Sequence, residues 1–344
     1  MNVENIDLEN IKKNLSIEEL NRFLKQISNL KVLIIGDIII DEYVFVKPKG
    51  RAIKDPILST SFIKQEKYAG GILAIANHVQ SFVKQVKLVT LIGDQRSEIN
   101  LIKNSLKSNI SLKIFVKSDS PTTNKKRFID SYRNNNKLFK VEYINDKPIS
   151  DKLTREIVSY LHKEIPKYDL VIVGDFGHGF INQPIRNVLQ KKSKFLSINV
   201  QSNSANMGYN YINHYERADF ITMNDEELRM PLMMRFQPLE EVLFKFNEKF
   251  NYSKFLVTVG KEGSILFNNR KLYKSPVLIK TVVDTVGAGD ALFSIASLFI
   301  YINADERIIP FLANCAGGIK ANYIGNKESV TKQKLLSFVK ETLQ

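Results

Sequence analysis

The sequence predicts an α/β fold, with a doubly wound and mostly parallel β-sheet that carries helices on both faces. Short apolar runs of strand length recur along the 344 residues, and each ends in a polar or glycine-bearing loop. Continuous apolar runs of this kind are typical of parallel strands that are buried on both faces. Helical patterns lie between the runs, so we expect helices to connect successive parallel strands.

The first predicted pair is a helix and the strand that follows it. Ser16 opens SIEELNRFLKQISNL as a capping residue, and Glu19 stands three positions later as its capping-box partner. Apolar residues then recur at helical spacing: Ile17, Leu20, Leu24 and Ile27. The run KVLIIGD at 31–37 comes next and is expected to be a buried strand.

Later apolar runs predict further strands and one central helix. The strand candidates are LVIVGDFGHG at 170–179, KFLSINV at 194–200, ADFITMND at 218–225 and KFLVTVG at 254–260. The run ALFSIASLFIYI at 291–302 is apolar on nearly every face, which indicates a helix buried in the centre of the molecule.

Two segments break the alternation of strands and helices: 42–71 and 111–143. Both are rich in β-branched and aromatic residues and contain turn signals, so neither resembles a crossover helix. We expect residues 42–68 and 113–140 to form a small β-sheet that projects over the strand ends as a lid. The rest of 16–344 completes a single domain, and residues 1–15 are expected to form a loose tail.

Composition limits the classes of partner. The net charge is +14, but the basic residues are scattered and form no long run, which favours a lysine-rich surface over a nucleic-acid site. The longest apolar run is too short to span a bilayer, so no membrane partner is expected. Cys315 is the only cysteine, and the opening MNVENIDLEN lacks the features of a secretory signal. A reducing, cytoplasmic location follows as the expectation.

The stretch DTVGAGDALFS at 284–294 places an unusual start before the central helix. Gly287, Ala288 and Gly289 stand where an ordinary helix has a capping side chain. Small residues let a ligand approach the main chain, and the first N–H groups of a helix favour anions. Asp290 would then hold a carboxylate next to a bound anion. Ordinary folds avoid such a like-charge arrangement, which suggests that Asp290 is a reacting group.

Other candidate site residues follow the predicted strands. In open α/β sheets, ligands bind beyond the carboxyl ends of the strands. Polar residues and glycines fall at these ends: Asp37, Asp41, Gly70, Gly71, Asp175, Gly179, Asn224, Glu227, Thr258 and Gly260. Each loop alone is weak evidence, because such folds turn with glycine, but their conjunction indicates one site.

Several motifs point elsewhere and are set aside. Asp175 begins the tripeptide DFG, but the chain has no His-Arg-Asp catalytic loop of a protein kinase. The chain lacks GxGxxG spacing after a strand, which argues against a dinucleotide site. The four histidines are scattered, which argues against a permanent zinc site. Only His178 lies in a candidate loop, where a substrate contact and a loop-stabilising role stay open.

The DTVGAGD stretch at 284–290 resembles the C-terminal signature of the ribokinase-like (PfkB-type) family of ATP-dependent sugar kinases. Other motifs follow in the family's order: AGG at 69–71, MNDEE at 223–227, VTVGKEG at 257–263 and LANCAGG at 312–318. The resemblance runs from about Ser16 to the end of the chain. Within the family, GDIIIDEY, PTTNKKRFID, GDFGHG and NKLFKVEY look most like heptose-7-phosphate kinases, the kinase half of bifunctional ADP-heptose synthases.

The resemblance implies a catalytic centre and a sugar site. Asp290 matches the base that takes a proton from the attacking sugar hydroxyl. Gly287, Ala288 and Gly289 match the anion hole that holds the transferring phosphoryl group. Asp41 matches the carboxylate that grips sugar hydroxyls. Three further residues complete the expected sugar site: Gly70, Gly71 and Asp175.

The resemblance also implies ATP and Mg²⁺ as cofactors. Asn224 and Glu227 match the NxxE motif that orders magnesium and its waters, without a permanent metal site. Thr258 and Gly260 match a nucleotide-contacting turn. Two more residues have implied roles: Asn314 matches the wall of the adenine pocket, and Asp284 is expected to order the signature loop. Whether a monovalent cation also binds at that loop stays open.

Two departures leave the substrate open. Ala74 stands where the family usually has a sugar-binding Asn, with Asn77 one turn later. Asn199, Val200 and Gln201 replace the Asp-Pro-Lys of heptose kinases. The expected function is an ATP-dependent kinase acting on a sugar or sugar phosphate, most like heptose 7-phosphate. A ribokinase or phosphofructokinase-type activity, and a catalytically silent sugar or nucleotide sensor, are the alternatives.

Two expectations concern partners. The lid should form a homodimer with its copy, because apolar residues of its ribbons would otherwise be exposed: Val44, Phe45 and Val46. The heptose kinases act in nucleotide-sugar synthesis, and no part of these residues resembles their nucleotidyltransferase half. We therefore expect a separate nucleotidyltransferase to act downstream.

Overall fold

The computed structural model describes residues 3–5, 8–133, 135–203, 206–278 and 282–344. Within them, a single sheet of 13 strands runs in the order β1-β13-β12-β11-β10-β9-β8-β2-β4-β5, with β3, β6 and β7 branching from β2. The strands are β1 (Val3–Asn5), β2 (Lys31–Arg51), β3 (Leu58–Gly71), β4 (Gln85–Gln95), β5 (Ile110–Pro121), β6 (Asn124–Asp130), β7 (Asn136–Tyr143), β8 (Leu170–Asp175), β9 (Leu196–Val200), β10 (Phe220–Asn224), β11 (Lys254–Thr258), β12 (Ser264–Asn268) and β13 (Lys271–Ser275).

The central strands of this sheet are parallel, which confirms the predicted α/β fold. The pairs β5–β4, β4–β2, β2–β8, β8–β9, β9–β10 and β10–β11 are all parallel. Antiparallel pairing joins β11, β12 and β13 near one edge. The strands predicted at 170–179, 194–200, 218–225 and 254–260 are β8, β9, β10 and β11.

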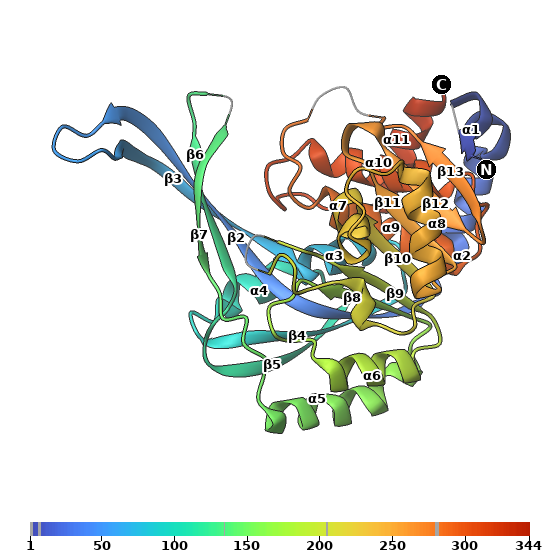
Figure 1. Ribbon diagram of the computed structural model, residues 1–344, viewed down its shortest axis with the longest axis horizontal. Helices are drawn as coiled ribbons and strands as arrows, with labels where there is room; N and C mark the ends of the chain where they lie inside the picture. The colour runs from blue at the N-terminus through green and yellow to red at the C-terminus, as the bar shows by residue number, and fades with distance from the viewer. Residues whose placement is uncertain (1–2, 6–7, 134, 204–205, 279–281) are drawn as a thin grey trace.

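Helices cover both faces of the sheet (Figure 1). They are α1 (Leu8–Asn14), α2 (Ile17–Ile27), α3 (Ile72–Val79), α4 (Ile99–Ser105), α5 (Asp151–Glu164), α6 (Gln183–Lys192), α7 (Asp225–Arg229), α8 (Leu239–Phe250), α9 (Ala288–Tyr301), α10 (Ile309–Ala321) and α11 (Lys332–Leu343). None of the described helices is long and apolar enough to cross a membrane.

Two hydrophobic cores explain why the strand runs are continuously apolar. In β2, Val32 and Ile34 pack into one core with α2, α3, α9 and α10. Leu33 belongs to the second core, on the side of α5, α6 and α8, as does Ile35. Successive side chains of a strand point to opposite faces, so both faces of this strand need apolar residues.

The predicted start of α2 is confirmed in part. The Ser16 side chain caps the helix by accepting a hydrogen bond from the Glu19 N–H at 3.0 Å. The Glu19 carboxylate does not complete the capping box, because it pairs with Arg22 at 3.0 Å.

The lid grows out of the same sheet. Beyond Ile38, β2 leaves the body and pairs with β3 in antiparallel and with β6 in parallel, and β7 pairs with β6. The β2–β3 and β6–β7 hairpins project from the body (Figure 1). Val44, Phe45 and Val46, which we expected at exposed edges, are buried, because strands flank this part of β2 on both sides.

The second lid segment starts later than expected. Residues 113–121 belong to β5, which pairs with β4 in the body, and the lid hairpin begins at Asn124. An edge strand of the body and a lid strand have the same β-branched and aromatic composition, so composition could not separate them. Asn134, within this segment, lies outside the described residues.

The expected loose tail instead carries two elements. Val3–Asn5 forms β1 and pairs in parallel with β13. In α1, Ile11 is buried, and Leu15 directly after the helix is buried with it. These two residues are one helical turn apart, a short signal that is easily missed beside polar neighbours. Residues 1, 2, 6 and 7 of the expected tail lie outside the described residues.

Candidate active site

The N-terminus of α9 is open as the sequence predicts. Gly287 is its N-cap residue, has φ +81°, and provides no side-chain cap. In the part of the chain that the structure describes, the N–H groups of Gly287, Gly289 and Asp290 have no hydrogen-bond partner. The N–H of Ala288 donates to the Thr285 carbonyl at 3.1 Å. Free donors at a helix N-terminus favour an anion, and here they come from Gly287, Gly289 and Asp290.

Only glycine fits at position 287. A Cβ there would lie 2.4 Å from Asn326 Oδ1 and 3.2 Å from Lys320 Cε, and the positive φ disfavours any other residue. Gly289 differs, because a Cβ built on it would meet no atom within 4 Å. The absence of a side chain at 289 leaves the approach to the helix end clear.

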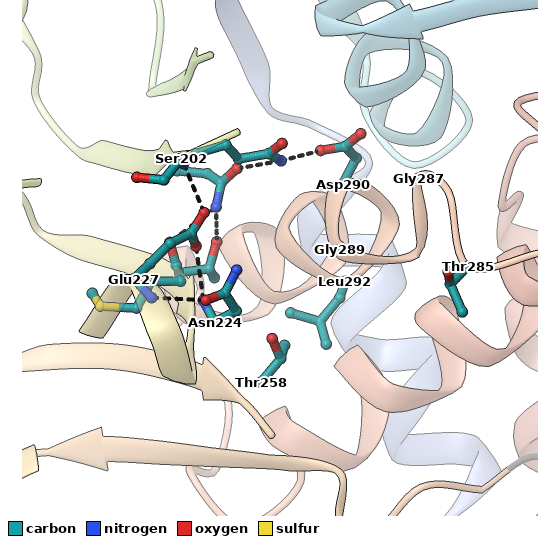
Figure 2. Close-up of a pocket in the computed structure, with 13 residues that line it drawn as sticks. Ser202, Asn224, Glu227, Thr258, Thr285, Gly287, Gly289, Asp290 and Leu292 are labelled. Carbon is teal, nitrogen blue, oxygen red and sulfur yellow. Dashed lines mark hydrogen bonds between the residues drawn. The ribbon is translucent and has the colours of Figure 1, made fainter. Parts of the chain in front are cut away.

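A cavity of about 260 Å³ lies in front of this helix end. It brings together six residues predicted for catalysis or nucleotide binding: Gly287, Gly289, Asp290, Asn224, Glu227 and Thr258. Figure 2 shows Asp290 on one side of this cavity and the Asn224–Glu227 pair on the other. Residues from the ends of β9, β10 and β11 thus meet the start of α9, as expected at the carboxyl edge of a parallel sheet.

Asp290 is buried, and among the described residues its carboxylate has one side-chain partner. Gln201 Nε2 donates to its Oδ1 at 2.8 Å and also to Asn199 Oδ1 at 2.9 Å. Burial raises the pKa of Asp290 to about 6, although the Gln201 hydrogen bond opposes that rise. A carboxylate with a pKa near neutrality is suited to act as a general base. Sequence reasoning noticed Gln201 only as a departure from the heptose kinases.

Asn224 and Glu227 form a complete capping box at the start of α7. Asn224 Oδ1 accepts from the Glu227 N–H at 2.8 Å, and Glu227 Oε2 accepts from the Asn224 N–H at 2.9 Å. Glu227 Oε1 also accepts from the Ser202 N–H at 2.9 Å. Burial raises the pKa of Glu227 to about 7. These side chains therefore stabilise the fold locally as well as lining the cavity.

Asp41 lies at the base of the lid. Its Oδ1 accepts from Arg127 at 2.5 Å, and its Oδ2 accepts from Asn326 at 3.1 Å. A Cβ on Gly70 would lie 2.1 Å from Asp41 Oδ2, so glycine at 70 makes room for this carboxylate. Lys125 is buried in the strand position that pairs with Asp41.

Asn326, Arg127 and Lys125 were not among the predicted site residues. The motif PTTNKKRFID contains two of them and carries part of the family resemblance, so it was an available signal. Nothing in the sequence around Asn326 points to its place between Asp41 and Gly287.

The remaining predicted residues lie apart from the cavity. Asp175 is buried, and its carboxylate accepts from the Tyr215 hydroxyl at 2.9 Å and the Gly177 N–H at 3.1 Å. Gly71 is the N-cap of α3 with φ +56°, and a Cβ there would lie 2.8 Å from the Asp37 carbonyl oxygen. Asp175 therefore fixes the loop after β8, and Gly71 fixes the junction between β3 and α3.

Two predicted nucleotide residues also have structural roles. Gly260 begins a short 3₁₀ turn with φ +52°. The Asn314 amide donates to the carbonyls of Ser275 at 3.0 Å and Pro276 at 2.9 Å, and its Oδ1 accepts from the Ser264 hydroxyl at 2.9 Å. Asn314 therefore holds the ends of β12 and β13 together.

His178 is almost fully buried, and its Nδ1 lies 2.9 Å from Asp146 Oδ1. This contact ties the loop after β8 to the segment before α5. It supports the loop-stabilising role among the two alternatives.

Comparison with known proteins places this site in a family. The family described as pfkB family carbohydrate kinase matches residues 29–302. The bifunctional protein HldE of Nitratiruptor sp. is 23% identical over 299 residues, which cover 86% of this chain and 62% of that protein. HldE of Desulfatibacillum aliphaticivorans is 25% identical over 304 residues, which cover 87% of this chain and 61% of that protein. The chain thus spans less than two thirds of the length of these relatives.

Solved structures show the same fold. Ribokinase from Thermotoga maritima superposes with a TM-score of 0.70 at 17% identity and covers 90% of this chain and 99% of its own. Phosphofructokinase-2 from Escherichia coli, in complex with fructose-6-phosphate, superposes with a TM-score of 0.70 at 10% identity. The match covers 92% of this chain and 100% of that chain. The family match spans most of the chain and includes the open start of α9, so the chain belongs to the pfkB family of carbohydrate kinases.

Proposed function

We propose that this carbohydrate kinase transfers the γ-phosphoryl group of ATP to a hydroxyl of a sugar phosphate that resembles heptose 7-phosphate. The observation that carries the proposal is the position of Asp290 in the first turn of α9. Its carboxylate lines the same cavity as Asn224, Glu227 and Thr258. Asn326 lies between Asp41 and the start of α9, which connects the cavity to the base of the lid.

In this mechanism each group has one task. Asp290 accepts the proton of the attacking hydroxyl as the oxygen bonds to phosphorus. The free N–H groups of Gly287, Gly289 and Asp290 hold the oxygens of the transferring group. Asp41 orients the sugar through its hydroxyls. The reaction leaves ADP and a sugar with one more phosphate.

Asn224 and Glu227 fit a role next to Mg²⁺, which neutralises phosphate charge when bound. Both line the cavity beside Asp290. Both Glu227 oxygens already accept backbone N–H bonds, so a carboxylate held in this way suits contact with magnesium through water. Carboxylates and waters are the partners that Mg²⁺ prefers.

A second cavity supports an anionic sugar. It measures about 320 Å³ and is lined by Ala74 and Asn326, among other residues. Lys67, Lys107 and Lys327 also line it, together with Glu328, and Lys67 is paired with Glu98 at 2.5 Å. Asn326 reaches Asp41, so a sugar held at Asp41 could extend a phosphate toward these lysines. The small side chain of Ala74 leaves room for it.

A panel of acceptors in an ADP-release assay tests this proposal. We expect heptose 7-phosphate to give a higher kcat/KM than fructose 6-phosphate or ribose. Ala74→Asn, which restores the common family residue, should lower kcat/KM for the sugar phosphate and spare ribose. Asn104→Ala, at the exposed side of the same cavity, serves as the control. A preference for ribose or fructose 6-phosphate would instead establish the ribokinase or phosphofructokinase-type alternative. Binding without turnover for every acceptor would indicate a sensor.

The lid suggests a homodimer. Exposed apolar side chains gather on its ribbons, including Phe62 at 67% exposure and Phe139 at 51%. Such residues are candidates for burial against a second copy. Sedimentation at micromolar concentration should show a dimer, and Phe62→Ser should shift it toward monomer.

The place of the product follows from the proposed substrate. A sugar that carries a new phosphate is a substrate for nucleotidyl transfer, so a separate nucleotidyltransferase would act next. ATP consumption and the single Cys315 are consistent with a reducing, cytoplasmic location.

A further inference from the structure

Lys320 is a buried cation that the mechanism has not used. It lies on α10 and is only 1% exposed. Its ammonium donates to the Val286 carbonyl at 2.8 Å and to the Gly325 carbonyl at 2.5 Å. Lysine is almost never fully buried unless it is paired, so this placement requires an explanation.

The two carbonyls belong to the loops that shape the catalytic centre. Val286 directly precedes Gly287, the N-cap of α9. Gly325 directly precedes Asn326, which binds Asp41. The ammonium therefore links the two loops behind the open helix end. Gly287 also makes room for the lysine, because a Cβ there would lie 3.2 Å from Lys320 Cε.

Nearby carboxylates favour the charged form of the Lys320 side chain. Burial lowers the pKa of Lys320, but the carboxylates of Asp284, Asp290 and Asp41 oppose that change. A positive charge behind the free N–H groups adds to the field that they present to a phosphoryl group. Inside a protein such a charge is screened far less than in water.

The sequence analysis left open whether a monovalent cation binds at the signature loop. The residues present do not fit one. Asp284 Oδ2 accepts from the Tyr43 hydroxyl and the Gly325 N–H, both at 2.9 Å. Its Oδ1 accepts from Lys137 at 2.9 Å and from the Val286 N–H at 3.2 Å. Its carboxylate is thus occupied by four donors, and two carbonyls of the same loops already bind an ammonium.

We infer that Lys320 is a built-in substitute for a monovalent cation, and that the kinase works without potassium. The side chain is a positioning residue: it holds the Val286 and Gly325 carbonyls and so fixes the donors at the start of α9. A covalently attached cation is present at any salt composition. The enzyme should therefore be indifferent to which monovalent ion the solution contains.

The unmodified protein gives the first test. Affinity for a non-hydrolysable ATP analogue, thermal stability and turnover are compared in potassium, sodium and choline chloride at equal ionic strength. We expect each binding or rate constant to change by less than about twofold between salts. Activation by potassium alone, by about fivefold or more, would overturn the inference. The binding and stability measurements need no sugar, so they stand even if the proposed substrate is wrong.

Lys320 variants give the second test. Lys320→Met keeps the length and removes the charge, so kcat should fall about 10- to 100-fold, less than the roughly 100- to 1000-fold cost of losing a donor that contacts the reacting group directly. Lys320→Ala also leaves space, and it should gain binding of rubidium in equilibrium dialysis and regain turnover with potassium but not with choline. A Lys320→Ala variant that is fully active in choline, or that binds no rubidium, contradicts the inference.

Lys117 provides a matched control. It is also a buried lysine, and its ammonium donates to the carbonyls of Asn145 and Lys147. It lies away from α9, beside Asp37 and His178. Lys117→Ala should lose stability as any buried lysine would, without gaining potassium-dependent turnover. Equal potassium rescue in both variants would assign the effect to general stabilisation by salt and overturn the proposed role.

Discussion

Two acidic residues near the same edge of the sheet have opposite surroundings. Asp290 lies at the open start of α9, where Gln201 donates to its carboxylate and a cavity lies before it. Asp175 lies at the end of β8, where Tyr215 and the Gly177 N–H bind its carboxylate and Arg186 Nε is 3.6 Å away. A carboxylate with spare acceptor capacity can serve a ligand, whereas one that is fully bound braces the fold.

The difference also shows what a sequence pattern can distinguish. Both residues stand beside glycines and close to long apolar runs, so both were reasonable site candidates. Their partners differ because of residues that are distant in the chain: Tyr215 comes 40 positions after Asp175, and Gln201 comes 89 positions before Asp290. Substitutions at the two carboxylates should therefore separate activity from stability.

The largest effect is expected from Asp290→Asn. The amide keeps the size of the side chain but cannot accept the hydroxyl proton, so turnover should fall by roughly two to four orders of magnitude. ATP-analogue affinity should survive or rise slightly, because a negative charge near the phosphates is lost. Steady-state kinetics and calorimetric titration measure both. Near-normal turnover in a folded variant that binds ATP would exclude Asp290 as the base.

Asp175→Asn should have the reverse profile. It removes the charge that faces Arg186 in the interior, so the free energy of unfolding should fall by about 2 to 4 kcal/mol. The kcat of the folded fraction should change less than about threefold. Urea unfolding and active-site-normalised rates test this split. A stable variant with a strongly raised KM for the sugar would instead support Asp175 as a substrate-contacting residue.

Stability should depend on pH through Asp290. Its pKa is about 6 in the folded protein against 3.8 as the ordinary value. The stability contributed by protonation is therefore fully present below the ordinary value and lost as pH rises through about 6. Asp290→Asn has no such loss, so it should be more stable than the unmodified protein by about 1 to 3 kcal/mol at neutral pH. Melting curves across pH should show the two proteins converging in acid.

The pH dependence of turnover should respond to Gln201. The acid limb of kcat/KM should have its midpoint near the Asp290 pKa of about 6. Gln201→Lys places a cation beside the carboxylate and should lower that midpoint by about one unit. Gln201→Met removes the hydrogen bond and should raise it. Midpoints that stay fixed in both variants would mean that another group controls the limb.

The smallest effect is expected from Asn224→Ala. The loss of the helix cap should cost about 1 kcal/mol of stability. Substitution of a residue that only binds a ligand would have no such cost. The magnesium concentration for half-maximal turnover should also rise several-fold. Ser150→Ala is the control, because Ser150 caps α5 through the Leu153 N–H. Equal magnesium dependence in both variants would remove Asn224 from the metal site.

Local patterns predicted the fold more fully than the site. Continuous apolar runs placed β2, β8, β9, β10 and β11, because burial on both faces leaves a direct trace in composition. The signature around Gly287 predicted the open helix start, because the close approach of neighbouring atoms at that position requires glycine and so leaves a trace in the sequence. Residues 113–121 were misplaced in the lid, because edge strands share their composition with ribbons.

The missing site residues depend on contacts that no local pattern encodes. Lys320 ends an apolar helical stretch and reads as an ordinary surface lysine, yet its ammonium is buried against two loops. Asn326 is placed by the packing of a turn against Asp41. Asn314 illustrates the converse, because a residue carried over from the family is held by three partners of its own chain.

The continuity of β2 has a mechanical consequence. One strand of 21 residues runs from the body into the lid, and β3 leads directly into α3, so the β2–β3 hairpin is attached to the body without an intervening loop. Asp41 stands four positions beyond Asp37, the last residue that pairs with β4. Displacement of a clamped beam grows with distance from its clamp, so the far tip near Arg51 can swing widely while Asp41 barely moves. Under the proposed function, elastic bending of this hairpin would let a sugar enter and leave while Asp41 keeps its position relative to Asp290.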